Sequence, residues 1–446
     1  MVVSDTIFAL SSGGLPSGVA VIRISGPGCS NALTAMIGKI PAPRHASLCS
    51  IRNRNGDILD QGLVLFFPNP ASFTGEDSAE LHIHGGRATV RAALDALAAI
   101  PGLRPAEAGE FSRRAFHNGK LDLVEIEGLA DIVSAQTEMQ RRLALEHAAG
   151  GVSKLYDDWT RRLTHARAMI EAELDFADEE DVPGAVGQTI REDLRAICAE
   201  IAQHLKGARA GEIIRDGLTV VITGPPNVGK SSLINYLAGR DIAIVTDIPG
   251  TTRDVIAVDL DLDGFAVRVL DTAGIRDTVE VVEMEGIRRA RSAVASADLI
   301  LRLVDKSESV ATISTAAAQH GGAPTIYIAP KSDLDDRTGN TARPGSIIPI
   351  STRTGDGMEA LLDTIRQHLP HVTDAAAFAI PSRERHNDAL RTALHAIEDA
   401  LAFDAQSLEL QAESLRMAAN AIGRITGRVD VENLLDVIFS EFCIGK

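Results

Sequence analysis

The chain has 446 residues, which is longer than one ordinary hydrophobic core and predicts about two to four domains. Its net charge of −17 argues against broad electrostatic binding of nucleic acid, so any RNA contact is expected to be local or assisted by a partner. The four cysteines lack zinc-site spacing, no apolar stretch is long enough to cross a bilayer, and the N-terminus lacks signal-peptide character. These features predict a cytoplasmic protein in a reducing compartment.

Residues 1–118 predict a mixed α/β module, which forms the first expected domain. Short apolar strands at 18–24 and 62–67 alternate with Gly/Pro turns, and a helix is predicted at 88–99. Residues 109–122 add dense polar and aromatic content where this module ends, although this segment could simply be the capped start of a helix.

Residues 72–86 are the most unusual segment of this module. As a strand, the segment places Glu80, His82 and His84 on one face and apolar residues on the other. Three such side chains could bind a metal ion, but no further cluster of ligands is visible in the sequence. A polar pocket, in which the carboxylate pairs with ring N–H groups of a nitrogen-rich ligand, fits the pattern better.

The segment 119–215 is predicted to be helical, because apolar positions recur every three or four residues, and an acidic stretch that ends at Pro183 marks a break between helices. A nucleotide-binding module is predicted at 216–372. The helical pattern returns at 373–446, where one amphipathic helix is expected over 408–442. The economical interpretation is one helical domain with the central module inserted, since insertion at a helix connection leaves both cores intact. Separate small bundles remain possible.

Residues 224–231 read Gly-Pro-Pro-Asn-Val-Gly-Lys-Ser, which fits the phosphate-loop pattern. The backbone N–H groups of such a loop cradle phosphate oxygens, Lys230 reaches the outer phosphates, and the Ser231 hydroxyl binds Mg²⁺. A glycine-rich turn that matches by chance is the alternative, but the apolar strand before the loop and the helix after it argue against chance. The predicted nucleotide contacts in this segment are Asn227, Val228, Gly229, Lys230, Ser231 and Ser232.

Two downstream segments complete the predicted phosphate site. Asp271, at the end of an apolar strand, is placed to hold Mg²⁺ through water, and the N–H group of Gly274 can contact a γ-phosphate. Between the two motifs, Thr252 is predicted to close over the γ-phosphate and Mg²⁺ as an order–disorder switch. The predicted contacts in these segments are Thr246, Asp247, Ile248, Pro249, Gly250, Thr251, Thr252, Asp271, Thr272, Ala273 and Gly274.

Base selection is predicted at residues 331–333. A carboxylate at Asp333 accepts from both N1–H and the exocyclic amine of guanine, a pair of donors that adenine does not offer. GTPases usually have Asn-Lys-x-Asp here, and this chain has Pro330 in place of the asparagine. One contact with the base and the tie to the phosphate loop are therefore expected to be lost, which weakens affinity. Residues 351–353 fit the last guanine-contacting loop, although the usual Ser-Ala-Lys is only partly kept. The predicted base contacts are Lys331, Asp333, Ser351, Thr352 and Arg353.

The sequence lacks two common parts of a hydrolytic site. Ile275 stands where Ras-like enzymes place a glutamine that orients water, and no arginine finger is evident in the chain. Asn227 could help to hold a monovalent cation in the place of an arginine finger, or it could be a turn residue. The residues alone favour neither alternative.

The chain ends in Cys-Ile-Gly-Lys after the predicted C-terminal helix. Cys443 lies near a free end, so it is exposed in principle and potentially reactive. The commoner role of a lone cysteine is that of a small apolar residue that closes a helix. The terminal lysine, Lys446, does not fit a prenylation signal.

Together these motifs resemble one family. The Phe-Thr-Gly-Glu-Asp of 73–77, the His-Gly-Gly of 84–86, the segment 109–122, the central GTPase module and the Cys-Ile-Gly-Lys tail are similar to the MnmE (TrmE) family of bacterial tRNA-modification GTPases. The resemblance covers essentially the whole chain. It implies an N-terminal α/β tetrahydrofolate-binding domain that dimerises, followed by a helical domain into which a Ras-like P-loop GTPase domain is inserted.

The resemblance also implies an activity and its partners. A member of this family is a K⁺-activated GTP hydrolase that works with the FAD-containing partner MnmG (GidA), in a heterotetramer or larger complex. Together they add a (carboxymethyl)aminomethyl group to carbon 5 of the tRNA wobble uridine, with a one-carbon unit from 5-formyltetrahydrofolate or a related tetrahydrofolate. The folate positions that carry over to this sequence are Arg23, Glu80, Lys120 and Lys446.

Further residues carry over to the hydrolytic site. The K⁺ ligand carries over to Asn227, and the glutamate that orients the attacking water through a second water carries over to Glu283. Cys443 matches a family cysteine, for which we expect a catalytic role. The backbone groups around K⁺ carry over to Thr246, Ile248 and Thr251.

Two other functions stay open at this stage. One is a GTPase switch in ribosome assembly without modification chemistry; such factors usually carry a basic RNA-binding module, and the sequence predicts no strongly basic domain. The other is a folate-dependent aminomethyl transferase with a regulatory domain. Bound tetrahydrofolate would argue against the first, and loss of wobble-uridine modification on deletion of the gene would argue against the second.

Overall fold

The structure, a computed structural model, describes residues 5–175, 185–244, 257–271, 294–305, 323–334, 347–371, 378–403 and 407–429, with residues 435, 438, 439 and 445. The chain divides into two compact units. The first unit contains residues 1–130, 147–195 and 392–446, and the second contains residues 131–146 and 196–391.

The first unit begins with a mixed sheet whose described strands run in the order β3-β4-β5-β2-β1-β6. The strands are β1 (Thr6–Leu10), β2 (Ser17–Ser25), β3 (Ser47–Arg52), β4 (Ile58–Phe67), β5 (Ser78–Gly85) and β6 (Leu103–Pro105). β1 pairs in parallel with β6, and the other neighbours pair antiparallel.

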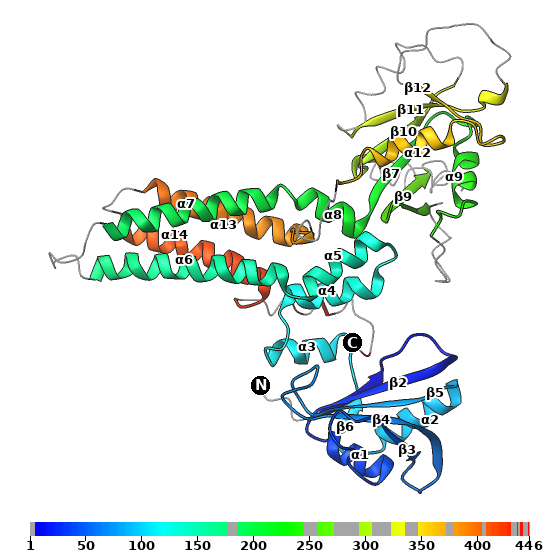
Figure 1. Cartoon of the computed structure of the whole chain (residues 1–446), viewed down its shortest axis with the longest axis vertical. Helices are drawn as coiled ribbons and strands as arrows, with labels where there is room; N and C mark the ends of the chain where they lie inside the picture. The colour runs from blue at the N-terminus through cyan, green and yellow to red at the C-terminus, as the bar shows by residue number, and fades with distance from the viewer. Residues whose placement is uncertain are drawn as a thin grey trace, which may run out of the picture. The chain divides into compact units, whose positions relative to one another are not determined.

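Two helices, α1 (Cys29–Ile37) and α2 (Arg87–Ala98), cover one face of this sheet (Figure 1). Side chains alternate between the faces along each strand, so Leu81 and Ile83 enter the core beneath the helices. Glu80 and His82 therefore lie on the opposite face, which the two helices leave open. This is the α/β module that the sequence predicts, with β4 longer than the expected strand at 62–67.

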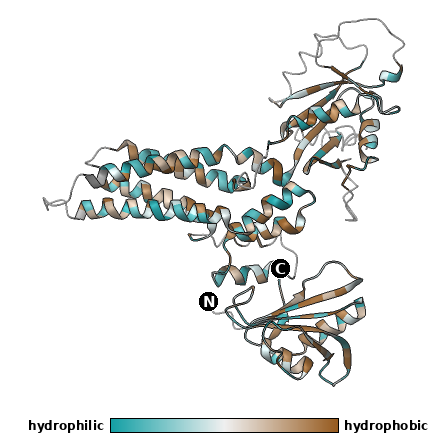
Figure 2. Ribbon diagram, viewed as in Figure 1, coloured by the Kyte–Doolittle hydropathy of each residue, from teal (hydrophilic) through white to brown (hydrophobic). Residues whose placement is uncertain are grey.

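Helices make up the rest of the described part of the first unit. They are α3 (Glu110–His117), α4 (Leu123–Ser134), α5 (Glu138–Ala148), α6 (Gly151–Asp175), α7 (Ala185–Leu205), α13 (Glu384–Ala402) and α14 (Leu408–Thr426), of which α4, α5, α7 and α13 extend into the second unit. α6 packs along α14, and Arg191 of α7 donates to the carbonyl of Leu401 at 3.1 Å and to that of Phe403 at 2.8 Å. The helices combine hydrophobic and hydrophilic residues along their length (Figure 2). The domain boundaries at 119, 216 and 373 stay predictions.

The C-terminal helix is shorter than the sequence predicts. α14 ends at Thr426, so the prediction of one continuous helix over 408–442 is wrong. Gly427 follows with a φ of 85°, and a Cβ atom at this position would lie 2.7 Å from both the ring of Phe116 and Leu123. The left-handed backbone and the close approach both require glycine, and they stop the helix here.

The second unit contains a sheet whose described strands run in the order β12-β11-β10-β7-β9-β8. The strands are β7 (Leu218–Thr223), β8 (Ala257–Leu262), β9 (Phe265–Asp271), β10 (Leu299–Leu303), β11 (Thr325–Ala329) and β12 (Ile347–Pro349). Only the β8–β9 pair among these is antiparallel. β7 is an almost continuous buried apolar run, as expected for a central parallel strand.

The helices α8 (Ala208–Asp216), α9 (Lys230–Ala238) and α12 (Met358–Arg366) complete the described part of this unit. Apolar residues of all three join the strands in one core. The carboxyl ends of β7, β9, β10 and β11 lie at one edge of the sheet (Figure 1), which is where ligands bind in open parallel sheets. Among the helices that the structure describes, none is long and apolar enough to cross a membrane.

Candidate functional site

The loop between β7 and α9 has an unusual backbone conformation. Gly224 has a φ of 143°, and a Cβ atom there would lie 2.6 Å from the carbonyl oxygen of Leu303 on β10. Asn227 is left-handed, with a φ of 61°, and Gly229 directly precedes α9. The first N–H groups of α9 have no partner within the helix, so they are available to an anion at the loop.

Three side chains meet where β7 and β9 end. Lys230 is only 8% exposed, and its Nζ donates to the carbonyls of Gly224 at 3.0 Å and Pro225 at 2.8 Å. The Ser231 hydroxyl donates to Oδ2 of the fully buried Asp271 at 3.2 Å. The β7–β9 register explains this contact, because it places Asp271 beside the end of the strand that leads into the loop. The predicted neighbourhood of Lys230, Ser231 and Asp271 is therefore present, while their roles stay predictions.

The predicted base-binding residues also lie close together. Asp333 is in a short 3₁₀ helix (Ser332–Leu334), and its Oδ1 accepts from the hydroxyl of the buried Ser351 at 2.8 Å. Arg353 Nε lies 3.0 Å from Oδ2 of the same carboxylate. The hydrogen bond from Ser351 and the charge of Arg353 lower the pKa of Asp333, so the carboxylate stays ionised and can accept two hydrogen bonds. Thr352 lies between these two residues, half-buried.

The structure modifies one expectation about Pro330. The sequence suggests that the tie between this loop and the phosphate loop is lost with the usual asparagine. Instead, Lys331, which has a φ of 60°, donates through Nζ to the carbonyl of Asn227 at 3.3 Å. Pro330 itself packs near Gly229. A tie between the two loops is therefore present, although it runs through the lysine.

The remaining predicted residues of this site and of the C-terminal tail lie outside the described residues. They are Thr246, Asp247, Ile248, Pro249, Gly250, Thr251, Thr252, Thr272, Ala273, Gly274, Glu283, Cys443 and Lys446.

The open face of the N-terminal sheet carries the second candidate site. Arg23 of β2 donates through Nε and Nη2 to Glu80 Oε1, at 3.2 and 3.1 Å. Nε2 of His82 lies 3.2 Å from the other oxygen of Glu80. His84, however, pairs with Asp60 of β4 at 2.9 Å, so the three predicted side chains do not converge. Among the described residues, no cluster of three such side chains is arranged to hold a metal ion.

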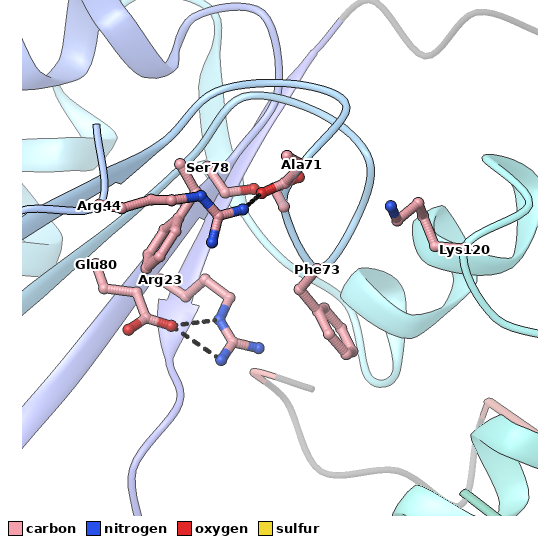
Figure 3. Close-up of a pocket in the computed structure, with 9 residues that line it drawn as sticks. Arg23, Arg44, Ala71, Phe73, Ser78, Glu80 and Lys120 are labelled. Carbon is pink, nitrogen blue, oxygen red and sulfur yellow. Dashed lines mark hydrogen bonds and ion pairs between the residues drawn. The ribbon is translucent and has the colours of Figure 1, made fainter. Parts of the chain in front are cut away.

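A cavity of about 480 Å³ opens beside the Arg23–Glu80 pair (Figure 3). Lys120 also lines this cavity, so three of the four predicted folate positions come together, and their role as folate contacts stays a prediction. Sequence reasoning missed Arg44 and Phe73, which line the same cavity. The Arg23 guanidinium carbon lies 5.2 Å from the centre of the Phe73 ring. The Phe-Thr-Gly-Glu-Asp motif signals Phe73, whereas no motif signals Arg44.

A buried ion cluster supports the loop that carries Phe73. Arg114 of α3, with a side chain only 3% exposed, pairs with Asp5 at 2.9 Å, Glu110 at 3.0 Å and Glu76 at 3.1 Å. Glu76 also accepts from the Ser25 hydroxyl at 2.8 Å, which joins the loop to β2. Burial alone would raise the pKa of Glu110, but hydrogen bonds from Arg104 and Arg114 lower it. The paired arginines of segment 109–122 were a signal of this cluster.

Comparison with known proteins gives consistent matches over the whole chain. The family model "MnmE helical domain" matches residues 123–443, and "GTP-binding protein TrmE N-terminus" matches residues 6–120. The tRNA modification GTPase MnmE of Rhizobium meliloti is 59% identical over 446 residues, which is all of both chains. The protein of the same name from Sinorhizobium medicae is 58% identical over 443 residues, which is 99% of each chain.

One solved structure matches part of this chain. A variant of Aquifex aeolicus Era, crystallised with GDP and AlF₄⁻, is similar with a TM-score of 0.28 and 26% identity, over 40% of this chain and 66% of that chain. The family models and the full-length relatives show that the chain belongs to the tRNA modification GTPase MnmE family.

Proposed function

We propose that this chain is a Mg²⁺-dependent GTP hydrolase that acts in tRNA modification. The observation that carries the hydrolase part is the contact between the Ser231 hydroxyl and the buried Asp271 carboxylate, 3.2 Å apart at the end of β7 and β9. Hard oxygen atoms of these two kinds suit Mg²⁺, one as a direct ligand and one through water. Lys230, the first residue of α9, adds positive charge beside the outer phosphates. When bound, Mg²⁺ neutralises developing charge on the phosphates.

Guanine selection is assigned to Asp333. Its carboxylate is held by the Ser351 hydroxyl at 2.8 Å and faces the loop that contains Arg353. Two oxygen acceptors match the N1–H and amino donors of guanine, and adenine presents no such pair. The tie from Lys331 to the phosphate loop supports this geometry despite Pro330.

In the proposed hydrolytic site, a potassium ion supplies the positive charge that an arginine finger supplies in other GTPases. Asn227 is the proposed side-chain ligand, with backbone groups of Thr246, Ile248 and Thr251, and Glu283 orients the attacking water. Support comes from the sequence, which has Ile275 in place of a catalytic glutamine and shows no arginine finger. The left-handed backbone of Asn227 fits a tight turn within the phosphate loop.

The tRNA chemistry follows from membership of the family and from the name of its relatives, tRNA modification GTPase MnmE. We propose that the chain works in the cytoplasm as a homodimer with the FAD-containing MnmG. The complex adds a (carboxymethyl)aminomethyl group to carbon 5 of the wobble uridine, and the N-terminal cavity with Arg23, Glu80 and Lys120 binds a tetrahydrofolate. The Lys446 side chain is proposed to contact the same tetrahydrofolate, and the Cys443 thiol is proposed to take part in the modification reaction.

Deletion of the gene and complementation test this proposal. Mass spectrometry of tRNA should show loss of the wobble-uridine modification, with recovery by the unaltered gene. Ser231→Ala should fail to restore it. Arg91→Gln is the matched control, because the exposed Arg91 of α2 pairs with Asp95 of the same helix and belongs to neither proposed site, and it should restore the modification fully. Normal modification in the deletion strain, with accumulation of ribosomal precursors, would instead support the ribosome-assembly alternative.

A further inference from the structure

The cavity beside Arg23 contains more positive than negative charge among the described residues that line it. Its cations are Arg23, Arg44 and Lys120, and its one carboxylate is Glu80. Glu80 balances Arg23, because both guanidinium donors reach the same oxygen, Oε1, at 3.2 and 3.1 Å. Neither Arg44 nor Lys120 has a carboxylate partner within the described ranges. Two positive charges are therefore left at the rim of the cavity.

Both of these cations are directed to one short loop. Arg44 donates through Nη2 to the carbonyl of Ala71 (Figure 3). Its guanidinium carbon lies 5.8 Å from the centre of the Phe67 ring. Lys120 donates through Nζ to the carbonyl of Pro70 at 3.1 Å. Adjacent carbonyls thus hold the two cationic groups, each of which has further donors to offer.

The backbone of Arg44 supports a specific role. Its φ of 61° lies in the left-handed region, which is uncommon for a residue that is not glycine. Its N–H donates to the carbonyl of Phe66 at 2.8 Å, which fixes this conformation beside β4. Such backbone conformations concentrate at ligand-binding positions.

We propose that Arg44, together with Lys120, binds the two carboxylates of the glutamate tail of a tetrahydrofolate. The cavity thereby selects folates over pterins that lack the tail. This inference rests on the proposed folate function and adds Arg44, to which neither the sequence motifs nor the family resemblance assigns a role.

Different residues of the cavity bind the ring and the glutamate tail of the proposed tetrahydrofolate. Arg23 and Glu80, with side chains 23% and 21% exposed, offer donors and acceptors to the nitrogen-rich ring. Arg44 and Lys120 are exposed at the rim, where a tail with two negative charges keeps much of its hydration. The planar guanidinium of Arg44 can meet a carboxylate with two parallel hydrogen bonds.

Equilibrium binding of three compounds to the full-length protein tests this assignment. The compounds are 5-formyltetrahydrofolate, 6-methyltetrahydropterin, which has the ring without the tail, and p-aminobenzoylglutamate, which has the tail without the ring. Arg44→Gln should weaken 5-formyltetrahydrofolate by about tenfold, as loss of one charge-assisted contact predicts, and should leave the pterin unchanged. Glu80→Gln should weaken both ring-containing compounds and spare the tail compound. Added salt should weaken the folate but not the pterin, because only the folate uses exposed charges.

Arg91→Gln is the matched control, since it removes one exposed arginine from α2, the helix that packs on the same sheet. The affinities for all three compounds should stay unchanged. Unchanged pterin binding by Arg44→Gln also shows that this variant folds. An equal loss of folate and pterin, or no loss of folate, would overturn the role of Arg44. Failure of the unaltered protein to bind any of the three compounds would overturn the folate function itself, which is a separate result.

Discussion

Replacing Asp333 with asparagine exchanges one carboxylate oxygen for an NH₂ group at the position where a guanine base is expected. The guanine donors N1–H and the exocyclic amine both need an acceptor, and asparagine offers one acceptor and a clashing donor. Each hydrogen bond to a charged group contributes roughly 1.5–3 kcal/mol, so the expected loss of GTP binding is about 3 kcal/mol or more. This corresponds to a rise in Kd of roughly a hundredfold or more.

The surroundings of Asp333 indicate that the loss of GTP affinity would come from the changed contact with guanine and not from a disrupted loop. Ser351 can still donate to Oδ1 of an asparagine, as it does to Asp333 at 2.8 Å. The pair with Arg353 would be lost, but the Arg353 side chain is 75% exposed, so solvent screens this pair and its loss changes the stability of the loop little.

The assay is nucleotide affinity, measured with fluorescent analogues of GTP and of XTP. Xanthine carries an oxygen where guanine carries its amine, so Asp333→Asn should bind XTP better than GTP. Ser351→Ala is the control, and it should weaken both nucleotides to a similar, smaller extent, because it loosens the side chain at position 333 without changing its chemistry. Unchanged GTP affinity in Asp333→Asn, or equal loss of GTP and XTP, would refute the assignment of base selection to this carboxylate.

Three further predictions concern other parts of the chain. Glu283→Ala should abolish GTP hydrolysis while Kd for GTP stays the same, in single-turnover and binding assays; an unchanged turnover rate would remove Glu283 from its role. Pro330→Asn should tighten GTP binding, but by less than tenfold, because Lys331 already ties the two loops together; a larger gain would show that this tie carries little weight. Arg114→Ala should lower the free energy of unfolding by about 3 kcal/mol, since it removes the arginine partner of Glu76, while Arg104 still pairs with Asp5 and Glu110; chemical denaturation with Arg91→Ala as control would measure it. The lowered pKa of Glu110 makes the free energy of unfolding depend on pH. The stabilisation by the ionised Glu110 is fully present above the usual pKa range of a glutamate, and it should be lost as the pH falls through the lowered pKa. A free energy of unfolding that stays constant in acid would contradict the role of this ion cluster.

The strand, loop and helix of the proposed phosphate site were predictable because their signals are local. The apolar run of β7, the glycines of the loop and the start of α9 follow one another in the sequence, and the structure contains all three. The contact between Ser231 and Asp271 also follows from the pattern, because the carboxyl ends of neighbouring parallel strands meet at one edge.

Other features depend on parts of the chain that are far apart in sequence. The end of α14 at Thr426 is set by the approach of Phe116 to Gly427, and helical periodicity beyond that point gives no sign of it. Arg44 looks like any exposed arginine until folding brings it beside the loop that contains Ala71. His84 shares the alternation of Glu80 but is drawn to Asp60 on a neighbouring strand. Tertiary contacts determine the end of α14, the position of Arg44 and the partner of His84, so these features could not be predicted from a single sequence.

GTP hydrolysis by the purified protein in K⁺ and in Na⁺, with ATP as the control nucleotide, tests the central claim most directly. A cation in place of an arginine finger predicts rapid turnover of GTP in K⁺, slow turnover in Na⁺, and no comparable turnover of ATP in either salt. Equal rates in K⁺ and Na⁺, or hydrolysis of ATP as fast as that of GTP, would contradict the account.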